Sequence, residues 1–271
     1  IWIFNATNKS SPYVIANVGR DSRDIYWKLP AMALIDDQNT IIFVNQDQRR
    51  YIQSYNTLNI MTVENGQVNF ILQDFKIDGS ISQGGFPSML VNKQGGPVCY
   101  VYQRLSIYDI QNRKSPVLKS QLNLNFVKMY GCVLSKNEET LYAVGDVLEN
   151  KVTRIMIRAI NVPNINAPQL LGSHIFSNSS AATNTTELSF DEKVLFVGFV
   201  DGVFMFDVRD PTQIIPFGFT YFTNELHAAK LANNGNAFYT AATSGVTTFD
   251  ISSQYILHIK NQILKIGGSY S

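Results

Sequence analysis

The sequence predicts an all-β protein, a β-propeller of about six four-stranded blades with the first blade incomplete at the N-terminus. The first observation is an internal repeat, since WIFNATNKSSPYVI from Trp2 can be laid without a gap over LSIYDIQNRKSPVL from Leu105, 103 or 104 residues apart. Further copies begin at Leu58, Arg158, Gly202 and Gly245. The polar anchor that closes each apolar run is Asn5, Thr62, Asp109, Asn161, Asp207 and Asp250 in turn, at steps of 57, 47, 52, 46 and 43 residues. Steps of this size are typical of propeller blades or solenoid repeats.

The second observation is a hairpin pattern that precedes five of the six anchor runs. Its copies are LIDDQNTIIFVNQ from Leu34, LVNKQGGPVCYVY from Leu90, LSKNEETLYAVG from Leu134, LSFDEKVLFVGF from Leu188 and LANNGNAFYTAA from Leu231. Polar turn residues between two apolar runs indicate a hairpin. With the anchor run and the apolar stretch after it, each repeat contains four strands. The expected blades span 1–26 (partial), 27–80, 81–125, 126–180, 181–223 and 224–271, in one domain.

The third observation is that the strand runs at 97–110 and 195–208 are almost continuously apolar. A sheet with one wet face would alternate polar and apolar residues. We therefore expect strands buried on both faces, as between stacked blades. No stretch of ten or more residues has helical apolar spacing, so long helices are not expected.

The first anchor run has no hairpin before it. We therefore expect a processed chain or a part of a longer polypeptide. Residues 255–267 could complete the first blade within the chain. A strand from another copy could do the same between molecules, which would make the protein an assembly subunit.

Two anchor copies, SIYDIQNRKSPVLKS from Ser106 and VFMFDVRDPTQIIPFG from Val203, resemble the LVIVD repeat. The hairpin copies at Leu134 and Leu188 resemble an element of YVTN-type surface propellers. The resemblance spans nearly the whole chain and implies a propeller from a large extracellular or cell-surface protein, with no catalytic residues to carry over. The sequence departs from the pattern where Asn5, Thr62 and Asn161 replace the anchor Asp and where Asn69, Ile214 and Leu257 replace a Pro.

The composition describes an ordered globular chain, with 45% hydrophobic and 16% charged residues. The net charge of +1 gives no field that would attract nucleic acid or an anionic membrane. Apolar stretches are interrupted within about a dozen residues, short of the ~20 that cross a bilayer. We expect no nucleic-acid partner and no membrane insertion; the expected partners are proteins, including copies of this chain.

Residues with the chemistry of an active site are scarce. No HExxH, GxSxG, P-loop or GxGxxG motif occurs. At the positions where propeller enzymes place channel ligands, only Asn184 and His227 could bind a metal, and a metal site needs three or more donors. The sequence thus predicts no metal, no cofactor, no catalytic residue and a non-enzymatic extracellular structural or interaction module. The alternatives are a propeller that binds a ligand at its channel mouth and a lactonase-like or hydrolase-like propeller enzyme. The residues expected at that mouth are Phe86, Tyr130, Asn184 and His227.

The anchors Asp109, Asp207 and Asp250 could suggest a metal site. A structural role is favoured, because short polar side chains accept hydrogen bonds from backbone N–H groups two or three residues on, and Asn and Thr fill the same slot.

Cysteine and asparagine bear on the compartment. Cys99 and Cys132 are expected to be buried thiols, with a disulfide between them as the alternative. Asn178 and Asn184 lie in a polar insertion, FSNSSAATNTTEL, and are the expected glycan acceptors if the chain is secreted. Asn8 is a third candidate. An extracellular or cell-surface location is the prediction.

Overall fold

The computed structural model consists of β-strands and turns in all the residues that it describes. These residues are 2–5, 13–17, 28–34, 39–47, 55–64, 67–80, 88–91, 98–101, 104–176, 182–221, 226–232, 235–242, 245–251 and 257–264. They contain 22 strands, and the strand pairs with a defined register are antiparallel. The predicted all-β, antiparallel class is therefore confirmed. The described part holds no helix long and apolar enough to span a membrane.

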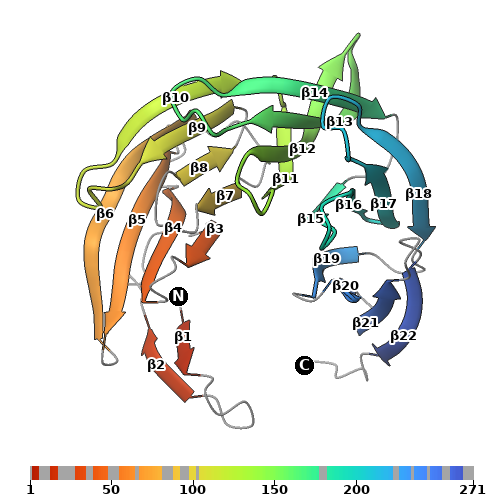
Figure 1. Cartoon of the computed structure of the whole chain (residues 1–271). Helices are drawn as coiled ribbons and strands as arrows, with labels where there is room; N and C mark the ends of the chain where they lie inside the picture. Colours follow the sequence, from red (N-terminus) through yellow and green to blue (C-terminus); the bar gives the residue numbers. More distant parts are fainter. Residues whose placement is uncertain are drawn as a thin grey trace. The chain divides into compact units, whose positions relative to one another are not determined.

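The described strands form one two-stranded sheet and five four-stranded sheets, each sheet a run of neighbours in chain order (Figure 1). The two-stranded sheet is Trp2–Asn5 (β1) and Tyr13–Asn17 (β2). Sheet B is Lys28–Leu34 (β3), Thr40–Asp47 (β4), Tyr55–Glu64 (β5) and Gln67–Ser80 (β6). Sheet C is Ser88–Val91 (β7), Val98–Val101 (β8), Arg104–Asp109 (β9) and Val117–Asn123 (β10).

Three further sheets follow. Sheet D is Lys128–Leu134 (β11), Thr140–Glu149 (β12), Val152–Asn161 (β13) and Gln169–Phe176 (β14). Sheet E is Ala182–Leu188 (β15), Val194–Phe199 (β16), Gly202–Asp207 (β17) and Ile215–Tyr221 (β18). Sheet F is Leu226–Leu231 (β19), Ala237–Ala242 (β20), Gly245–Ile251 (β21) and Leu257–Leu264 (β22). Each sheet lies inside one of the ranges expected from the repeat.

The chain divides into two compact units. Unit 1 comprises residues 1–100 and 105–120, and unit 2 comprises residues 101–104 and 121–271. In unit 1, β3 lies beside β7. Arg113, in the turn after β9, donates from Nη1 to Thr40 Oγ1 on β4 at 2.8 Å. Ile42 and Ile60 are fully buried in the centre of sheet B.

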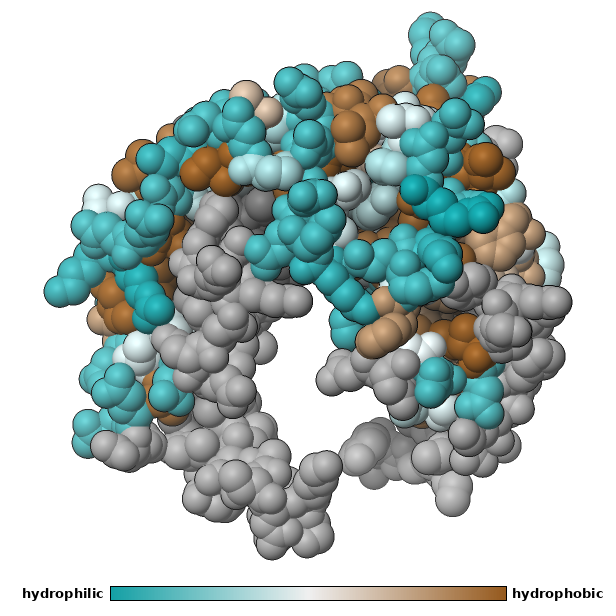
Figure 2. Space-filling model, in the orientation of Figure 1, coloured by the Kyte–Doolittle hydropathy of each residue, from teal (hydrophilic) through white to brown (hydrophobic). Residues whose placement is uncertain are grey.

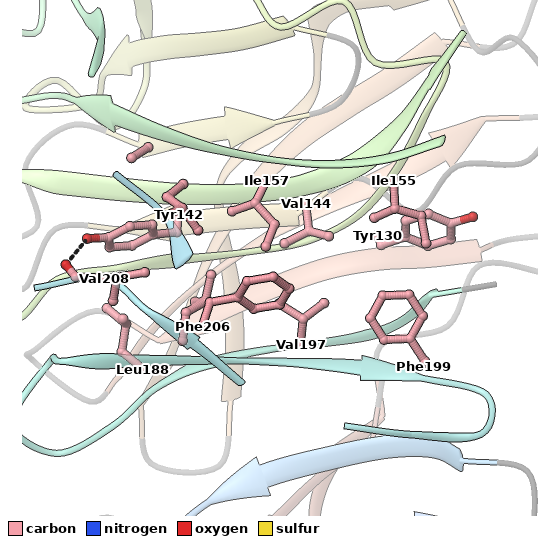
Figure 3. Packing of buried hydrophobic residues seen from close by; sticks show 13 residues of the cluster. Tyr130, Tyr142, Val144, Ile155, Ile157, Leu188, Val197, Phe199, Phe206 and Val208 are labelled. Atoms are coloured by element: carbon pink, nitrogen blue, oxygen red, sulfur yellow. Dashed lines mark hydrogen bonds between the residues drawn. The ribbon is translucent and has the colours of Figure 1, made fainter. Parts of the chain in front are cut away.

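Unit 2 stacks three sheets face to face. One buried cluster contains residues of sheets D and E, among them Val144, Ile157 and Val197 (Figure 3). A second cluster joins sheets E and F through Phe196 and Phe238. Neighbouring residues of β16 point to opposite clusters, and all six residues of β16 are buried. The prediction of strands buried on both faces is confirmed for this sheet.

The repeated anchors have the structural role expected of them. Asp109 Oδ1 accepts a hydrogen bond from the N–H of Gln111 at 3.0 Å, and Asp207 Oδ1 accepts one from the N–H of Arg209 at 3.1 Å. Both carboxylates thus hold the turn two residues beyond the strand.

Cys132 lies half-buried on β11. The side chain of Cys99, on β8, and both of the candidate glycan acceptors Asn8 and Asn178 lie outside the described residues, as does the side chain of Asn184. The disulfide and the glycosylation sites therefore stay predictions.

Candidate functional site

The first strands of the three sheets in unit 2 begin at the same end. β11 lies beside β15, and β15 lies beside β19. Along β15 and β19, Thr185 Oγ1 accepts from the N–H of Ala229 at 2.8 Å and Glu187 pairs with Lys230 at 2.7 Å, so these strands run in the same direction. The turns after β11 and β15 also meet, since the N–H of Lys136 donates to Glu192. We call the shared N-terminal end of β11, β15 and β19 the entry end of unit 2.

The register of each first strand is interrupted near the entry end by a β-bulge. In β11 the interruption falls between Met129 and Gly131 and leaves Tyr130 as the extra residue. In β19 it falls between Leu226 and Ala228 and leaves His227. In β15 it spans the segment from Ala182 to Thr186, which includes Asn184. Bulges re-aim side chains and are enriched beside active sites. Three of the four residues predicted for ligand binding thus occupy bulges at one end of unit 2.

Tyr130 is the predicted binding residue whose side chain the structure describes. It is only 4% exposed and belongs to the cluster between sheets D and E. Figure 3 shows its ring beside Ile155 and over Phe199, with the hydroxyl pointing away from the cluster. That hydroxyl donates to Asp146 Oδ2 at 2.8 Å, and Lys128 Nζ lies 4.7 Å from the centre of the ring. Phe86 and the side chains of Asn184 and His227 lie outside the described residues, so their role in binding stays a prediction.

Asp146 is held at the entry end by its backbone and by its side chain. It lies opposite Lys128, the first residue of β11, and its carbonyl accepts from the N–H of Val127 at 2.7 Å. The preceding residue is Gly145, where a Cβ would come within 2.6 Å of the Lys128 carbonyl oxygen and 2.7 Å of the Phe126 ring. A side chain at position 145 would thus push the two strands apart.

Burial dominates the electrostatics of this group. It raises the pKa of Asp146 above its ordinary value, although the hydrogen bond from Tyr130 and the charge of Lys128 both act to lower it. Burial, followed by the bond to Asp146, raises the pKa of Tyr130 as well, so the phenol stays protonated. The result is a partly buried carboxylate with a fixed donor on one oxygen and a proton affinity closer to neutral pH.

Tyr130 was among the residues predicted from the sequence, and Asp146 was not. The one signal in the sequence was that Asp146 interrupts the apolar run LYAVGDVL. Nothing in that run indicates that a bulge in the neighbouring strand brings the Tyr130 hydroxyl to the Asp146 carboxylate. Within the described ranges, no group of three or more His, Cys, Asp or Glu side chains converges as metal ligands do. The Glu187–Lys230 pair connects two strands, and Lys230 engages the carboxylate of Glu187.

The fold and the entry end together define an all-β, propeller-like protein with a partly buried carboxylate on β12 at the entry end of unit 2. Solved structures that share the fold include a periplasmic gluconolactonase from Pseudomonas aeruginosa, with a TM-score of 0.67, 11% identity and coverage of 93% of this chain and 75% of that one. A candidate 6-phosphogluconolactonase from Bacteroides fragilis has a TM-score of 0.70 and 12% identity, covering 97% and 77%. A protein from Lactobacillus plantarum has a TM-score of 0.70 and 11% identity, covering 95% and 76%.

No family model matches the sequence, and no curated protein matches it. The resemblance to LVIVD repeats therefore stays a prediction. The prediction of a non-enzymatic module is contradicted, because the structures that share the fold over more than nine-tenths of the chain include gluconolactonases. The absence of catalytic motifs misled that prediction, since active-site residues on such a scaffold come from separate strands and leave no local pattern.

Proposed function

We propose that this chain is a lactone hydrolase on a six-bladed β-propeller, with Asp146 as its general base. The observation that carries the proposal is the Tyr130–Asp146 pair at the entry end of unit 2. The gluconolactonase neighbours supply the reaction class.

A lactone is a cyclic ester, and its hydrolysis needs a water activated against the carbonyl carbon. In the proposed reaction Asp146 takes a proton from the water as its oxygen attacks that carbon. The ring C–O bond of the tetrahedral intermediate then breaks, and the departing ring oxygen takes up a proton to give the hydroxy acid. Tyr130 engages Oδ2 of Asp146, and we assign the second oxygen, Oδ1, to the attacking water. A positioned general base of this kind contributes a factor of about 10² to 10⁴ in rate.

The surroundings of Asp146 suit this role. The raised pKa makes its carboxylate a stronger base than one in water. Lys128 lies on the opposite strand, and its positive charge favours the ionised carboxylate. The same charge would stabilise negative charge that develops on the carbonyl oxygen of a substrate bound beside Asp146.

One finer feature belongs to the same proposal. The protein is secreted, which is supported by the periplasmic location of one neighbour and by the sequons at Asn178, Asn184 and Asn8.

The test is hydrolysis of five- and six-membered lactones, including glucono-δ-lactone, followed in a pH-stat with the spontaneous rate subtracted. We expect Asp146→Asn to lower kcat/KM by about 10² to 10⁴, because the amide keeps the shape but cannot accept the proton. Tyr130→Phe should cause a smaller loss. Asp207→Asn is the matched control, since it changes a carboxylate with a structural role. Unchanged activity in Asp146→Asn would contradict the assignment of the base, and no turnover above background with any lactone would contradict the function.

A further inference from the structure

The β12–β13 hairpin of sheet D extends past the entry end, unlike its counterparts in sheets E and F. Lys128, the first residue of β11, lies opposite Asp146, and three further pairs follow, of which the last is Glu149 with Val152. In sheets E and F the middle hairpin already ends at the residue opposite the first residue of β15 or β19. Three residues of strand span about 10 Å. The tip of the hairpin is the teal projection at the top of Figure 2.

This extension presents one apolar side chain on the same face as Asp146. Side chains alternate along a strand, so Leu148 shares a face with Asp146 and Val144. Val144 belongs to the cluster between sheets D and E, which shows that this face looks toward sheet E. Leu148 is nevertheless 61% exposed, because it lies beyond that cluster.

Leu148 is therefore an exposed aliphatic side chain two residues beyond Asp146 on the same face of β12. Gluconate-type lactones are covered with hydroxyl groups and gain little from such a neighbour, whereas a hydrocarbon chain would bury it.

We infer that the β12–β13 extension forms an apolar wall beside Asp146, with Leu148 as a specificity-determining residue, and that the substrate is a lactone bearing an alkyl chain. This inference rests on the proposed function. The ring carbonyl would face Asp146 and the alkyl chain would lie along Leu148.

The hairpin itself provides the matched control. Val152 is 52% exposed and lies near the same tip. It pairs with Glu149, the neighbour of Leu148, and because side chains alternate along a strand, Val152 lies on the face opposite to Leu148. We would compare wild type, Leu148→Ala and Val152→Ala on δ-decalactone and on glucono-δ-lactone. Leu148→Ala should lower kcat/KM for δ-decalactone about tenfold and change the value for glucono-δ-lactone less than twofold. Val152→Ala should change neither.

The outcomes separate this inference from the function on which it rests. Wild-type preference for glucono-δ-lactone, or an equal loss on both substrates, would overturn the apolar wall while the hydrolase stands. If neither lactone is hydrolysed, the proposed function is wrong. Calorimetric binding of the lactam analogue of δ-decalactone then tests whether Leu148 contacts the alkyl chain of a bound ligand. Weaker lactam binding in Leu148→Ala than in Val152→Ala would support this contact. Equal binding by the two variants would overturn it.

Discussion

At the scale of single residues, the proton affinity of Asp146 makes a prediction about pH. Its pKa is raised in the folded protein, chiefly by burial, so the folded state holds a proton that the unfolded state has already lost. Stability contributed by this group is therefore lost as pH rises from about 4, the ordinary pKa of Asp, through the raised value. Asp146→Asn removes the effect, because an amide does not ionise.

The measurement is urea denaturation of both proteins between pH 4 and pH 8. Across this window the free energy of unfolding of Asp146→Asn should rise relative to that of wild type. Above the raised pKa of Asp146 the difference between the two proteins should be constant. Over the same window kcat/KM of wild type should rise with pH, since the proposed base, Asp146, would act only when ionised. If wild type instead becomes more stable relative to Asp146→Asn as pH rises, the pKa of Asp146 is lowered in the folded protein.

The anchor Asp207 makes a second prediction at this scale. Its Oδ1 accepts from the N–H of Arg209, and Arg209 also lowers its pKa through hydrogen bonds from the side chain and the backbone. Asp207→Ala should lower the free energy of unfolding by about 1 kcal/mol, since the turn loses its acceptor. Asp207→Asn should cost less, because the amide oxygen can accept the same bond and the exposed ion pair contributes little. Equal losses in both variants would show that the charge matters more than the turn.

At the scale of elements, glycines on two outer strands permit different contacts. A Cβ at Gly172 on β14 would lie 2.5 Å from the carbonyl oxygen of Pro211 and 2.7 Å from that of Thr212, both in the turn between β17 and β18. A Cβ at Gly218 on β18 would meet instead the end of the Met205 side chain, at 2.7 Å. Backbone cannot move aside as a methionine can. Gly172→Ala should therefore destabilise by about 1 to 3 kcal/mol and Gly218→Ala by less than half as much. Thermal unfolding of the pair decides, and a larger loss in Gly218→Ala would contradict the backbone contact.

The tip of the β12–β13 hairpin is a two-residue turn with positive φ at both positions, 50° at Asn150 and 66° at Lys151. This is the geometry of a type I′ turn, for which Asn-Gly is the favoured pair. Lys151→Gly should raise the free energy of unfolding by about 0.5 to 1 kcal/mol, because glycine adopts positive φ without steric cost. Val152→Gly, one residue further in the strand, should lower it. A destabilising effect of Lys151→Gly in urea denaturation would contradict the turn type.

The sheets were predictable from sequence and the hairpin extension was not, for a physical reason. Turn chemistry such as LSKNEET and LSFDEKV marks a break between two apolar runs, and each such break joins the first two strands of a sheet. The tip between β12 and β13 contains neither glycine nor proline, and its one turn-favouring residue, Asn150, is followed by Lys151 and not by glycine, so the signal for where the strands end is weak. The pairing of Tyr130 with Asp146 depends on a bulge, and bulges arise from the fit between strands rather than from the local sequence.

At the scale of the whole molecule, the repeat predicted the all-β architecture well and the activity badly. Apolar periodicity records burial, and burial is what defines the sheets. Catalysis on such a scaffold depends on a few separate side chains, and Asp146, the proposed base, is a single polar residue inside the apolar run LYAVGDVL. The bulge positions of Tyr130, Asn184 and His227 were the part of the candidate site that the spacing of the repeat could locate, because the offset from each hairpin is preserved.

The charge of the molecule leads to a last prediction, about salt. Twenty-two basic and 21 acidic residues leave a net charge of +1, so the protein as a whole does not steer an anionic substrate. Lys128 is the basic residue beside Asp146, and its effect reaches only a short distance at physiological ionic strength. For δ-decalactone, which is neutral, kcat/KM should change less than about twofold between 50 and 500 mM NaCl. Initial rates at 50, 150 and 500 mM NaCl provide the measurement. The contrary result is a preference for 6-phosphogluconolactone at low salt, with a kcat/KM for that substrate that falls tenfold or more as salt rises. It would show that the site recognises a phosphate group and not an alkyl chain.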